Sequence, residues 1–313
     1  MAEKVPRRPY VLVIGAAGID SKGRAREPLT LNSSTPGFVR VSVGGTARNV
    51  ADNLTRLGIN TLLLSAVGND GSGRRVVNTA VEVGINTDYL MVCDDYHTAA
   101  YLAILDDKGN LVMSVDDMEI MEFITPRIIN RRRALIRNAE MVVMDSNLSE
   151  ASIESLFKVA NRYQVRICAD PTSASLARRL KPYLADIFMI TPNVAEAEVL
   201  SGKSIKNEDD ALAAARKLVK VGVKLAIITL AEAGVVYATA SESGHVPAVA
   251  TEVIDLTGAS DALTATVVFS ILNDIPLDES VRLGASAAAL TLACTDSVCQ
   301  ELSLDLLYDQ LLI

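Results

Sequence analysis

Residues 255–261 read DLTGASD and combine small residues with a carboxylate at the expected start of a helix. The small residues are Gly258, Ala259 and Ser260. Backbone N–H groups at a helix start are unpaired and lie at the positive end of the helix dipole, so this stretch predicts an anion site. Asp261 could accept a proton from an attacking hydroxyl, and an anion site beside a base suits phosphoryl transfer to an alcohol. A plain helix cap made by Thr257 and Asp261 explains the stretch equally well.

Two other polar segments stand where a helix is expected to begin. In VGGTARN, Gly44 and Gly45 would let a ligand approach the backbone, and Asn49 could bind hydroxyls. In TPNVAE, Asn193 and Glu196 would present an amide and a carboxylate on one helix face. That pair suits Mg²⁺ bound through water near phosphates. A tight turn is the alternative for the first segment, and helix capping is the alternative for the second.

Short apolar runs alternate with helical patterns along the chain, which predicts a mostly parallel sheet with helices on both faces. The predicted strands are Tyr10–Gly15, Thr61–Val67, Met141–Met144, Val165–Ala169, Ile187–Ile190 and Leu225–Leu230. The predicted helices are Ala47–Leu57, Arg74–Val83, Glu150–Tyr163, Asp209–Val221, Ala262–Leu272 and Val281–Cys294. In such α/β sheets, ligands bind at the carboxyl ends of the strands.

Two segments break this alternation. Residues 16–43 are rich in Gly, Pro, Ser and Thr and end in an alternating apolar run. Within residues 97–120, the stretches Ala99–Leu105 and Leu111–Val115 flank a turn and predict a hairpin. We expect the two segments to form a small antiparallel sheet that projects from a single domain, residues 8–313.

The composition argues against several classes of protein. A net charge of −8 and a pI near 5.0 disfavour nucleic-acid binding. Two histidines and four scattered cysteines disfavour a histidine-rich metal site, a Ser-His-Asp triad, a zinc site and a disulfide framework. The N-terminus lacks the apolar region of a secretory signal, and the apolar runs are shorter than the roughly 20 residues of a membrane span. We therefore expect a cytoplasmic protein without nucleic-acid or membrane partners, whose cysteines are reduced packing thiols.

Taken in this order, the polar segments resemble the ribokinase-like superfamily of carbohydrate and nucleoside kinases, of the phosphofructokinase-B type. The resemblance runs from GAAGID at 15–20 through SAVGNDGSG at 65–73 to DLTGASD, which is similar to the family signature DTxGAGD. It implies a ribokinase-like α/β fold with a β lid, and transfer of the γ-phosphate of ATP to a sugar hydroxyl with Mg²⁺. A monovalent cation such as K⁺ at Asp255 stays open, with a turn carboxylate as the alternative.

The resemblance also implies roles for individual residues. Asp261 would be the base, and the anion hole would consist of Gly258, Ala259 and Ser260. The sugar hydroxyls would be held by Asp20, Gly44, Gly45 and Asn49. Mg²⁺ would be bound, through water, by Asn193 and Glu196. The ATP site would contain Asn193, Thr229, Gly234, Thr257 and Gly258.

Finer details resemble the pseudouridine kinases within this superfamily. The similar stretches are the whole of 97–120, MDSNLSE at 144–150 and DPTSAS at 170–175. The residues near the nucleoside would be Thr98, Asn147 and either Asp117 or Asp116. The alternatives are a kinase for another sugar or nucleoside, such as ribose, fructose, inosine or adenosine, and a nucleoside-binding relative without transferase activity. Lids of this family often pair, so a homodimer through the lid is expected.

Three features depart from the family pattern. Ser260 replaces the second Gly of the signature, and it can donate the same N–H only if the turn does not require a positive φ. Leu256 replaces a Thr, and we expect its side chain to face the core. Ala231 and Ala233 stand where the family has a Gly-rich loop that borders ATP.

Overall fold

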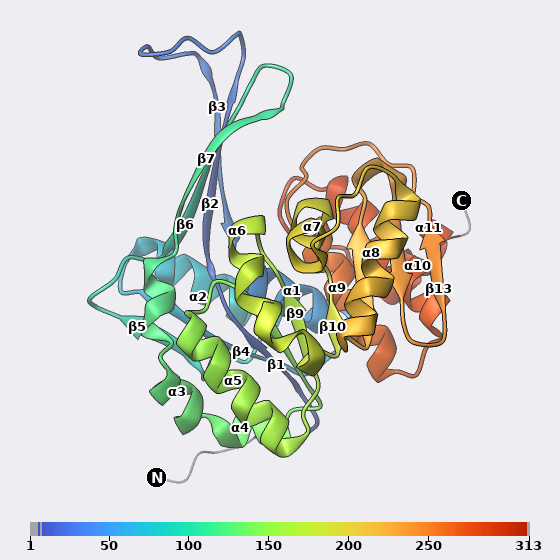
Figure 1. The fold of residues 1–313 in the computed structure, drawn as a ribbon. Coiled ribbons are helices and arrows are strands. Elements are labelled where there is room, and N and C mark those ends of the chain that lie inside the picture. The colour runs from blue at the N-terminus through green and yellow to red at the C-terminus, as the bar shows by residue number, and fades with distance from the viewer. Residues whose placement is uncertain (1–5, 7, 312–313) are drawn as a thin grey trace.

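Nine strands form the central sheet of the computed structural model, which describes residue 6 and residues 8–311 (Figure 1). In spatial order they are β13 (Ser243–Val246), β12 (Val235–Ala238), β11 (Leu225–Thr229), β10 (Met189–Ile190), β9 (Ile167–Asp170), β8 (Met141–Asp145), β1 (Val11–Ile14), β4 (Thr61–Gly68) and β5 (Leu90–Cys93). Neighbouring strands from β5 to β11 are parallel, and β11, β12 and β13 pair antiparallel at one edge. The prediction of a mostly parallel sheet is confirmed.

The strands are apolar on both sides because helices cover both faces of the sheet. All six predicted strands are present, as β1, β4, β8, β9, β10 and β11. Along β1, Val11 and Val13 belong to one core and Leu12 and Ile14 to the other, and all four side chains are buried. The sequence did not predict β5, β12 or β13, which lie at or beside the edges of the sheet.

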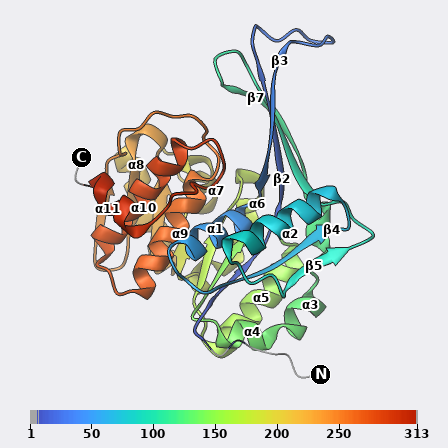
Figure 2. The ribbon, with the colours of Figure 1, turned by 180° about the vertical axis from the view of Figure 1, so that it is seen from behind.

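Two groups of helices cover the central sheet. On the face seen in Figure 1 lie α3 (Pro126–Arg131), α4 (Arg133–Asn138), α5 (Glu150–Tyr163), α6 (Ala174–Ala177), α7 (Val194–Ser201) and α8 (Glu208–Val221). The view from behind shows α1 (Thr46–Arg56), α2 (Gly71–Val83), α9 (Ala259–Leu272), α10 (Leu277–Leu292) and α11 (Leu304–Leu311) (Figure 2). Three 3₁₀ helices among the described residues are η1 (Glu119–Phe123), η2 (Arg178–Asp186) and η3 (Ala231–Ala233). None of the described helices is both long and apolar enough to cross a bilayer.

All six predicted helices are present, and five of them begin earlier than predicted, by one residue for α1 and α8 and by three or four residues for α2, α9 and α10. Helix α2 begins at Gly71, because the Asp70 side chain accepts a hydrogen bond from the Gly73 N–H and caps it. Helix α10 begins at Leu277, directly after Pro276. Helix α9 is buried along most of its length between α1 and α10 and has no polar stripe, as expected for a helix enclosed by its neighbours. This packing fixes the position of its first turn.

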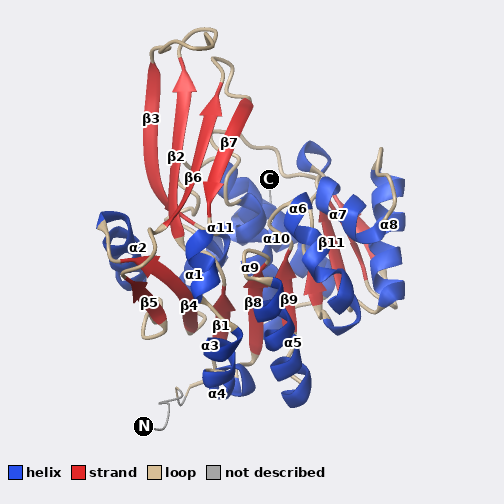
Figure 3. Ribbon diagram, turned by 60° about the vertical axis from the view of Figure 1, so that its left-hand side comes forward, coloured by secondary structure: helices blue, strands red, loops and turns tan. Residues whose placement is uncertain are grey.

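Four strands form a second, smaller sheet that stands away from the central one (Figure 3). In spatial order they are β3 (Gly37–Gly44), β2 (Gly18–Ala25), β6 (Ala99–Leu105) and β7 (Leu111–Asp117). The predicted hairpin is confirmed as β6 and β7, and β2 pairs antiparallel with β3. The central pair, β2 and β6, is parallel, so the prediction of an antiparallel sheet was wrong there. Both strands start at the central sheet and run outward, with Gly18 opposite Ala99.

The strand register gives the small sheet two chemically different faces. Paired residues on neighbouring strands point to the same face, and so do residues two apart on one strand. Asp20 pairs with Ser42 and Tyr101, and Lys22 lies two residues further along β2, so these residues share one face, here called the polar face. The other face, here called the apolar face, carries Val39, Val41, Leu102, Met113 and Val115.

Candidate active site

The loop before α9 brings the chain into the site through a turn that only glycine can make. Gly258 caps α9 with φ +85°, in the left-handed region. A Cβ atom at Gly258 would lie 1.8 Å from the Ser297 carbonyl oxygen. Ala259 and Ser260 are the first residues of α9, and N–H groups in a first helical turn have no carbonyl of a preceding turn to bind. The predicted anion site therefore has the backbone geometry that it needs.

Asp261 lies in the first turn of α9 and is buried. The Asn49 side chain, on α1, donates a hydrogen bond from Nδ2 to Asp261 Oδ2 at 2.6 Å. Burial raises the pKa of Asp261 to about 7, against the opposing effect of this hydrogen bond. A carboxylate with a pKa near neutrality is suited to take a proton at physiological pH and to release it again.

The side-chain oxygen of Asn49 has no hydrogen-bond partner among the described residues. The residue is 2% exposed. A buried acceptor without a partner costs about 1–3 kcal/mol, and the O–H of a bound ligand would satisfy it. The Asn49–Asp261 pair can thus receive one hydroxyl, with Asn49 orienting the carboxylate.

The predicted sugar-binding residues Asp20, Gly44 and Gly45 lie beside this pair. Asp20 is buried, and its charge contributes to the raised pKa of Asp261. A Cβ at Gly44 would lie 2.3 Å from the Asp20 carboxylate, and one at Gly45 would lie 2.6 Å from the Ala16 carbonyl oxygen. Burial raises the pKa of Asp20, although Lys22 and Arg48 oppose the rise. The two glycines therefore leave room for the carboxylate and for the chain entering α1.

A cavity of about 850 Å³ adjoins the first turn of α9. It extends from Ser260 and Asp261 to the ends of β9, β10 and β11, and its other walls come from α10 and residues 248–256. The predicted ATP-site residues that line it are Asn193, Thr229 and Gly234. Thr257 and Gly258 do not line the cavity but precede its first lining residue on α9, Ala259.

Asn193 and Glu196 form a reciprocal cap at the start of α7. Asn193 Nδ2 donates to Glu196 Oε1 at 2.7 Å, and the Asn193 N–H donates to Glu196 Oε2 at 2.9 Å. The Glu196 N–H returns a bond to Asn193 Oδ1 at 3.0 Å. The capping interpretation of this pair is therefore confirmed.

The Glu196 carboxylate could still take part in binding a metal. Each of its oxygens keeps a lone pair that could accept a hydrogen bond from a metal-bound water. Burial raises the pKa of Glu196.

The departures from the family pattern have different outcomes. Ser260 is helical and is not among the described residues with positive φ, so a serine donates the same N–H without strain. Ala231 does have a positive φ, +50°, where glycine would be unstrained. The expectation that Leu256 faces the core was wrong. Its side chain is 74% exposed and lines the cavity, because residues 248–256 run over the surface.

The residues proposed to lie near a nucleoside are not gathered into one cluster. The Thr98 hydroxyl donates to Asp70 Oδ1 at 2.7 Å and accepts from the Gly68 N–H at 2.9 Å. These bonds hold Thr98 against the segment that leads into α2. The register puts Asp117, opposite Ala100, on the apolar face, whereas Asp116, opposite Tyr101, shares the polar face with Asp20. The Asn147 N–H donates to Asp145 Oδ1 at 2.9 Å.

Sequence reasoning missed three residues of the site. Asp145, at the end of β8, accepts hydrogen bonds from the N–H groups of Ala16 and Ala47, which start the connections to the small sheet and α1. The signal for it was a buried strand that ends in a carboxylate. Ser297 donates to Asp20 Oδ2 at 3.3 Å, and Lys22 donates to Asp255. No local pattern marks these two, because their partners are distant in the sequence.

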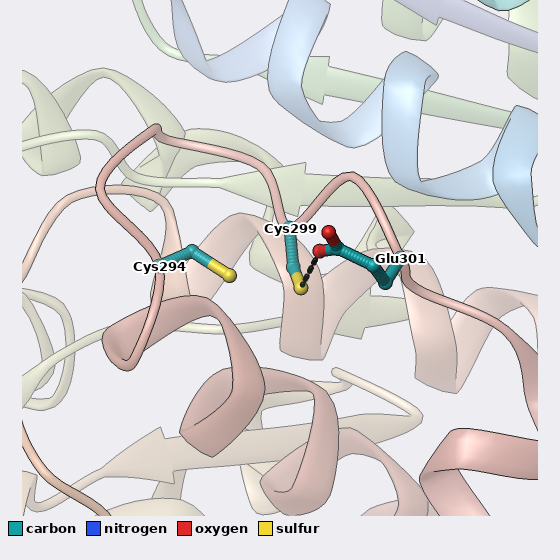
Figure 4. Close-up of side chains that lie close together, drawn as sticks. All are labelled: Cys294, Cys299 and Glu301. Carbon is teal, nitrogen blue, oxygen red and sulfur yellow. Dashed lines mark hydrogen bonds between the residues drawn. The ribbon is translucent and has the colours of Figure 1, made fainter.

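The segment that carries Ser297 also holds a small cluster of soft and acidic side chains. Cys294, Cys299 and Glu301 lie close together between α10 and α11 (Figure 4). The Cys299 thiol donates to Glu301 Oε2 at 3.6 Å, and burial raises the pKa of Cys299 to about 12. All four cysteines are free, as the sequence predicted.

Comparison with known proteins identifies the family of the chain. Residues 8–301 match the model of the pfkB family carbohydrate kinases. The chain belongs to this family. It is a phosphotransferase that acts on a sugar or nucleoside hydroxyl.

Individual relatives of this kinase differ in the acceptor that their names give. It is 32% identical to the pseudouridine kinase of Escherichia coli, over 92% of this chain and 91% of that protein. It is 29% identical to the guanosine-inosine kinase of Exiguobacterium acetylicum, over 92% and 95% of the two chains. A carbohydrate kinase from Agrobacterium tumefaciens has a similar structure, with a TM-score of 0.83 and 31% identity over 97% of each chain.

We predict that Gly258→Ala lowers the stability and the kcat of this kinase more than Gly58→Ala does. Both glycines have φ +85°, but a Cβ at Gly58 would have no neighbour within 4 Å. Gly58→Ala should cost about 1–2 kcal/mol of stability, the usual penalty for a left-handed residue. Gly258→Ala should cost more and lower kcat on the order of a hundredfold, because the first turn of α9 must shift. Urea unfolding and steady-state kinetics measure both effects, and equal behaviour of the two variants would contradict this explanation of the turn.

Proposed function

We propose that this kinase transfers the γ-phosphoryl group of ATP to the 5′-hydroxyl of pseudouridine, giving pseudouridine 5′-phosphate and ADP. The observation that carries the proposal is the buried Asn49–Asp261 pair beside the N-terminus of α9. Support for pseudouridine comes from the relative of that name and from the similarity of residues 97–120 to the lid of pseudouridine kinases.

In the proposed reaction the acceptor hydroxyl lies against Asp261 and the Asn49 amide. As the hydroxyl oxygen attacks phosphorus, its proton passes to the Asp261 carboxylate, and the bond from phosphorus to the bridging oxygen of ADP breaks. The N–H groups at residues 258–260 face the charge on the transferring phosphoryl oxygens. Asp20 and the backbone at Gly44 and Gly45 hold the remaining hydroxyls of the ribosyl ring.

The donor nucleotide is assigned to the 850 Å³ cavity. Thr229 ends β11, Gly234 and Thr257 lie on loops beside the cavity, and the phosphate end is assigned to Asn193 and Glu196. Mg²⁺ neutralises charge on the phosphates when it is bound, and Asn193 and Glu196 would hold it through water. The donor set of an amide and a buried carboxylate fits a hydrated Mg²⁺.

The small sheet is proposed to be a lid over the acceptor, formed by residues 16–43 and 97–120 of a kinase domain at 8–313. Its polar face places Tyr101 and Asp116 in one row with Asp20, so both are positioned to contact the base. The Thr98 hydroxyl is bonded within the fold and Asp117 points to the apolar face, so of the residues first expected near the nucleoside the proposal keeps Asn147 and Asp116 for the exposed edge of uracil. The guanosine-inosine kinase relative keeps a purine nucleoside as the second candidate acceptor.

A panel of acceptors tests this assignment. Purified protein with ATP and Mg²⁺ is offered pseudouridine, uridine, inosine, adenosine, ribose and fructose, and ADP release is measured together with the phosphorylated product. We expect the highest kcat/KM for pseudouridine. A higher value for another acceptor would refute the substrate but keep the chemistry. Binding of pseudouridine without turnover of any acceptor would favour the non-catalytic relative and refute the transferase.

We further propose that two copies of the chain pair through the apolar face of the small sheet. The register aligns Val41, Leu102 and Val115 in one row, and their side chains are 42%, 46% and 65% exposed. Val39 and Met113 follow in the next row and are 78% and 54% exposed. Strand β2 contributes Ser21 and Gly23 to these rows, and exposed apolar side chains gathered on both sides of it are typical of a protein interface.

Val115→Glu should therefore convert the dimer into a monomer, because it puts a charge next to Leu102 on the apolar face. Ser114→Glu is the matched control, since Ser114 precedes it on β7 and points to the polar face. Sedimentation velocity separates one 33.4 kDa chain from two. A wild-type protein that is monomeric at tens of micromolar, or a Val115→Glu variant that stays dimeric, would refute this interface.

A further inference from the structure

Lys22 connects the small sheet to the turn that leads into α9. Its Nζ donates to Asp255 Oδ1 at 2.7 Å, to Asp255 Oδ2 at 2.6 Å and to the Thr257 hydroxyl at 2.5 Å. An ammonium group has three N–H donors, so all of them are used within this one turn. The Lys22 and Asp255 side chains are only 12% and 17% exposed. An ion pair that is shielded from water and fully hydrogen-bonded contributes more to stability than an ion pair exposed on the surface.

Asp255 in turn shapes the anion site. Its Oδ1 also accepts the Thr257 N–H at 2.9 Å, which closes the turn before Gly258. Gly258 then caps α9 and directs the free N–H groups of the first helical turn. The position of the Lys22 ammonium is thereby connected, through Asp255 and Thr257, to the backbone that would face the phosphoryl group.

The sequence left open whether Asp255 binds a monovalent cation or serves as a turn carboxylate. Such an ion would need the carboxylate oxygens of Asp255 as ligands, and both already accept hydrogen bonds from Lys22. A second positive charge there would also be repelled by the ammonium. The residues present therefore do not fit a bound K⁺.

We propose that Lys22 is a positioning residue whose ammonium supplies, from within the chain, the positive charge that holds the turn at 255–258, so that this kinase needs no monovalent cation. Lys22 shares the polar face of β2 with Asp20, two residues earlier, which lies beside the acceptor site. The ammonium thus joins the strand that carries Asp20 to the turn that carries the anion site. The proposal rests on the assigned anion site at α9, and not on pseudouridine as the acceptor.

The test compares three variants in buffers that contain K⁺, NH₄⁺ or the bulky choline cation at the same ionic strength. The wild type should show the same kcat in all three buffers. Lys22→Ala should lose kcat by about 10–100-fold in choline, the range seen when a group that orients a site is removed, and recover much of it in K⁺ or NH₄⁺. Lys22→Met fills the space without the charge, so it should lose activity and not recover. Arg24→Ala removes an exposed cation two residues along the same strand and should behave as the wild type.

A second readout does not depend on turnover. Calorimetric binding of a non-hydrolysable ATP analogue should be weaker for Lys22→Ala in choline than in K⁺, while the wild type shows no difference. This measurement stands even if every acceptor of the panel fails, so the two proposals can fail separately. Activation of the wild type severalfold by K⁺ would overturn the inference. The inference would also be overturned if Lys22→Ala lost activity and thermal stability and recovered neither in K⁺ or NH₄⁺. Lys22 would then only stabilise the fold.

Discussion

The hydrogen bond between Asn49 and Asp261 joins two helices that are more than two hundred residues apart in the sequence. It holds a buried carboxylate in one orientation, and much of the site is arranged around that carboxylate. Helix α9 is enclosed by α1 and α10, and the Asp261 side chain is buried at its first turn. Because burial disfavours the charged form, the pKa of Asp261 rises to about 7, and the group becomes a base suited to neutral pH.

The surroundings of Asp261 are strongly acidic. Asp170, near Asp261 and Glu196, is also buried, and burial raises its pKa well above the ordinary value. Two cations offset part of this charge. Arg48 is buried and pairs with Asp52 at 3.0 Å, and Lys22 pairs with Asp255. Concentrated buried carboxylates lower stability, and ion pairs formed within the chain compensate part of that cost here.

The sequence predicted those parts of the molecule that local patterns encode. Buried strands, the hairpin and the α9 signature are local, and they were predicted together with Asp261 and Asn49. Contacts between distant segments were not predictable. Ser297 reaches Asp20 across 277 positions and Lys22 reaches Asp255 across 233 positions, and neither has a local signal. Asp116 and Asp117 illustrate a further limit, because a shift of one residue in strand register exchanges the faces to which they point.

The most direct test of Asp261 as the base is the pH dependence of kcat/KM for the wild type and for Asp261→Asn. The wild-type value should rise with pH through about 7, since the carboxylate must lose its proton before it can act as a base. Asp261→Asn should lower kcat by about 10²–10⁴-fold and remove this dependence, while acceptor affinity changes little. Asp274→Asn, the same change just beyond the other end of α9, is the control. Turnover of Asp261→Asn within a few-fold of the wild type would contradict the account.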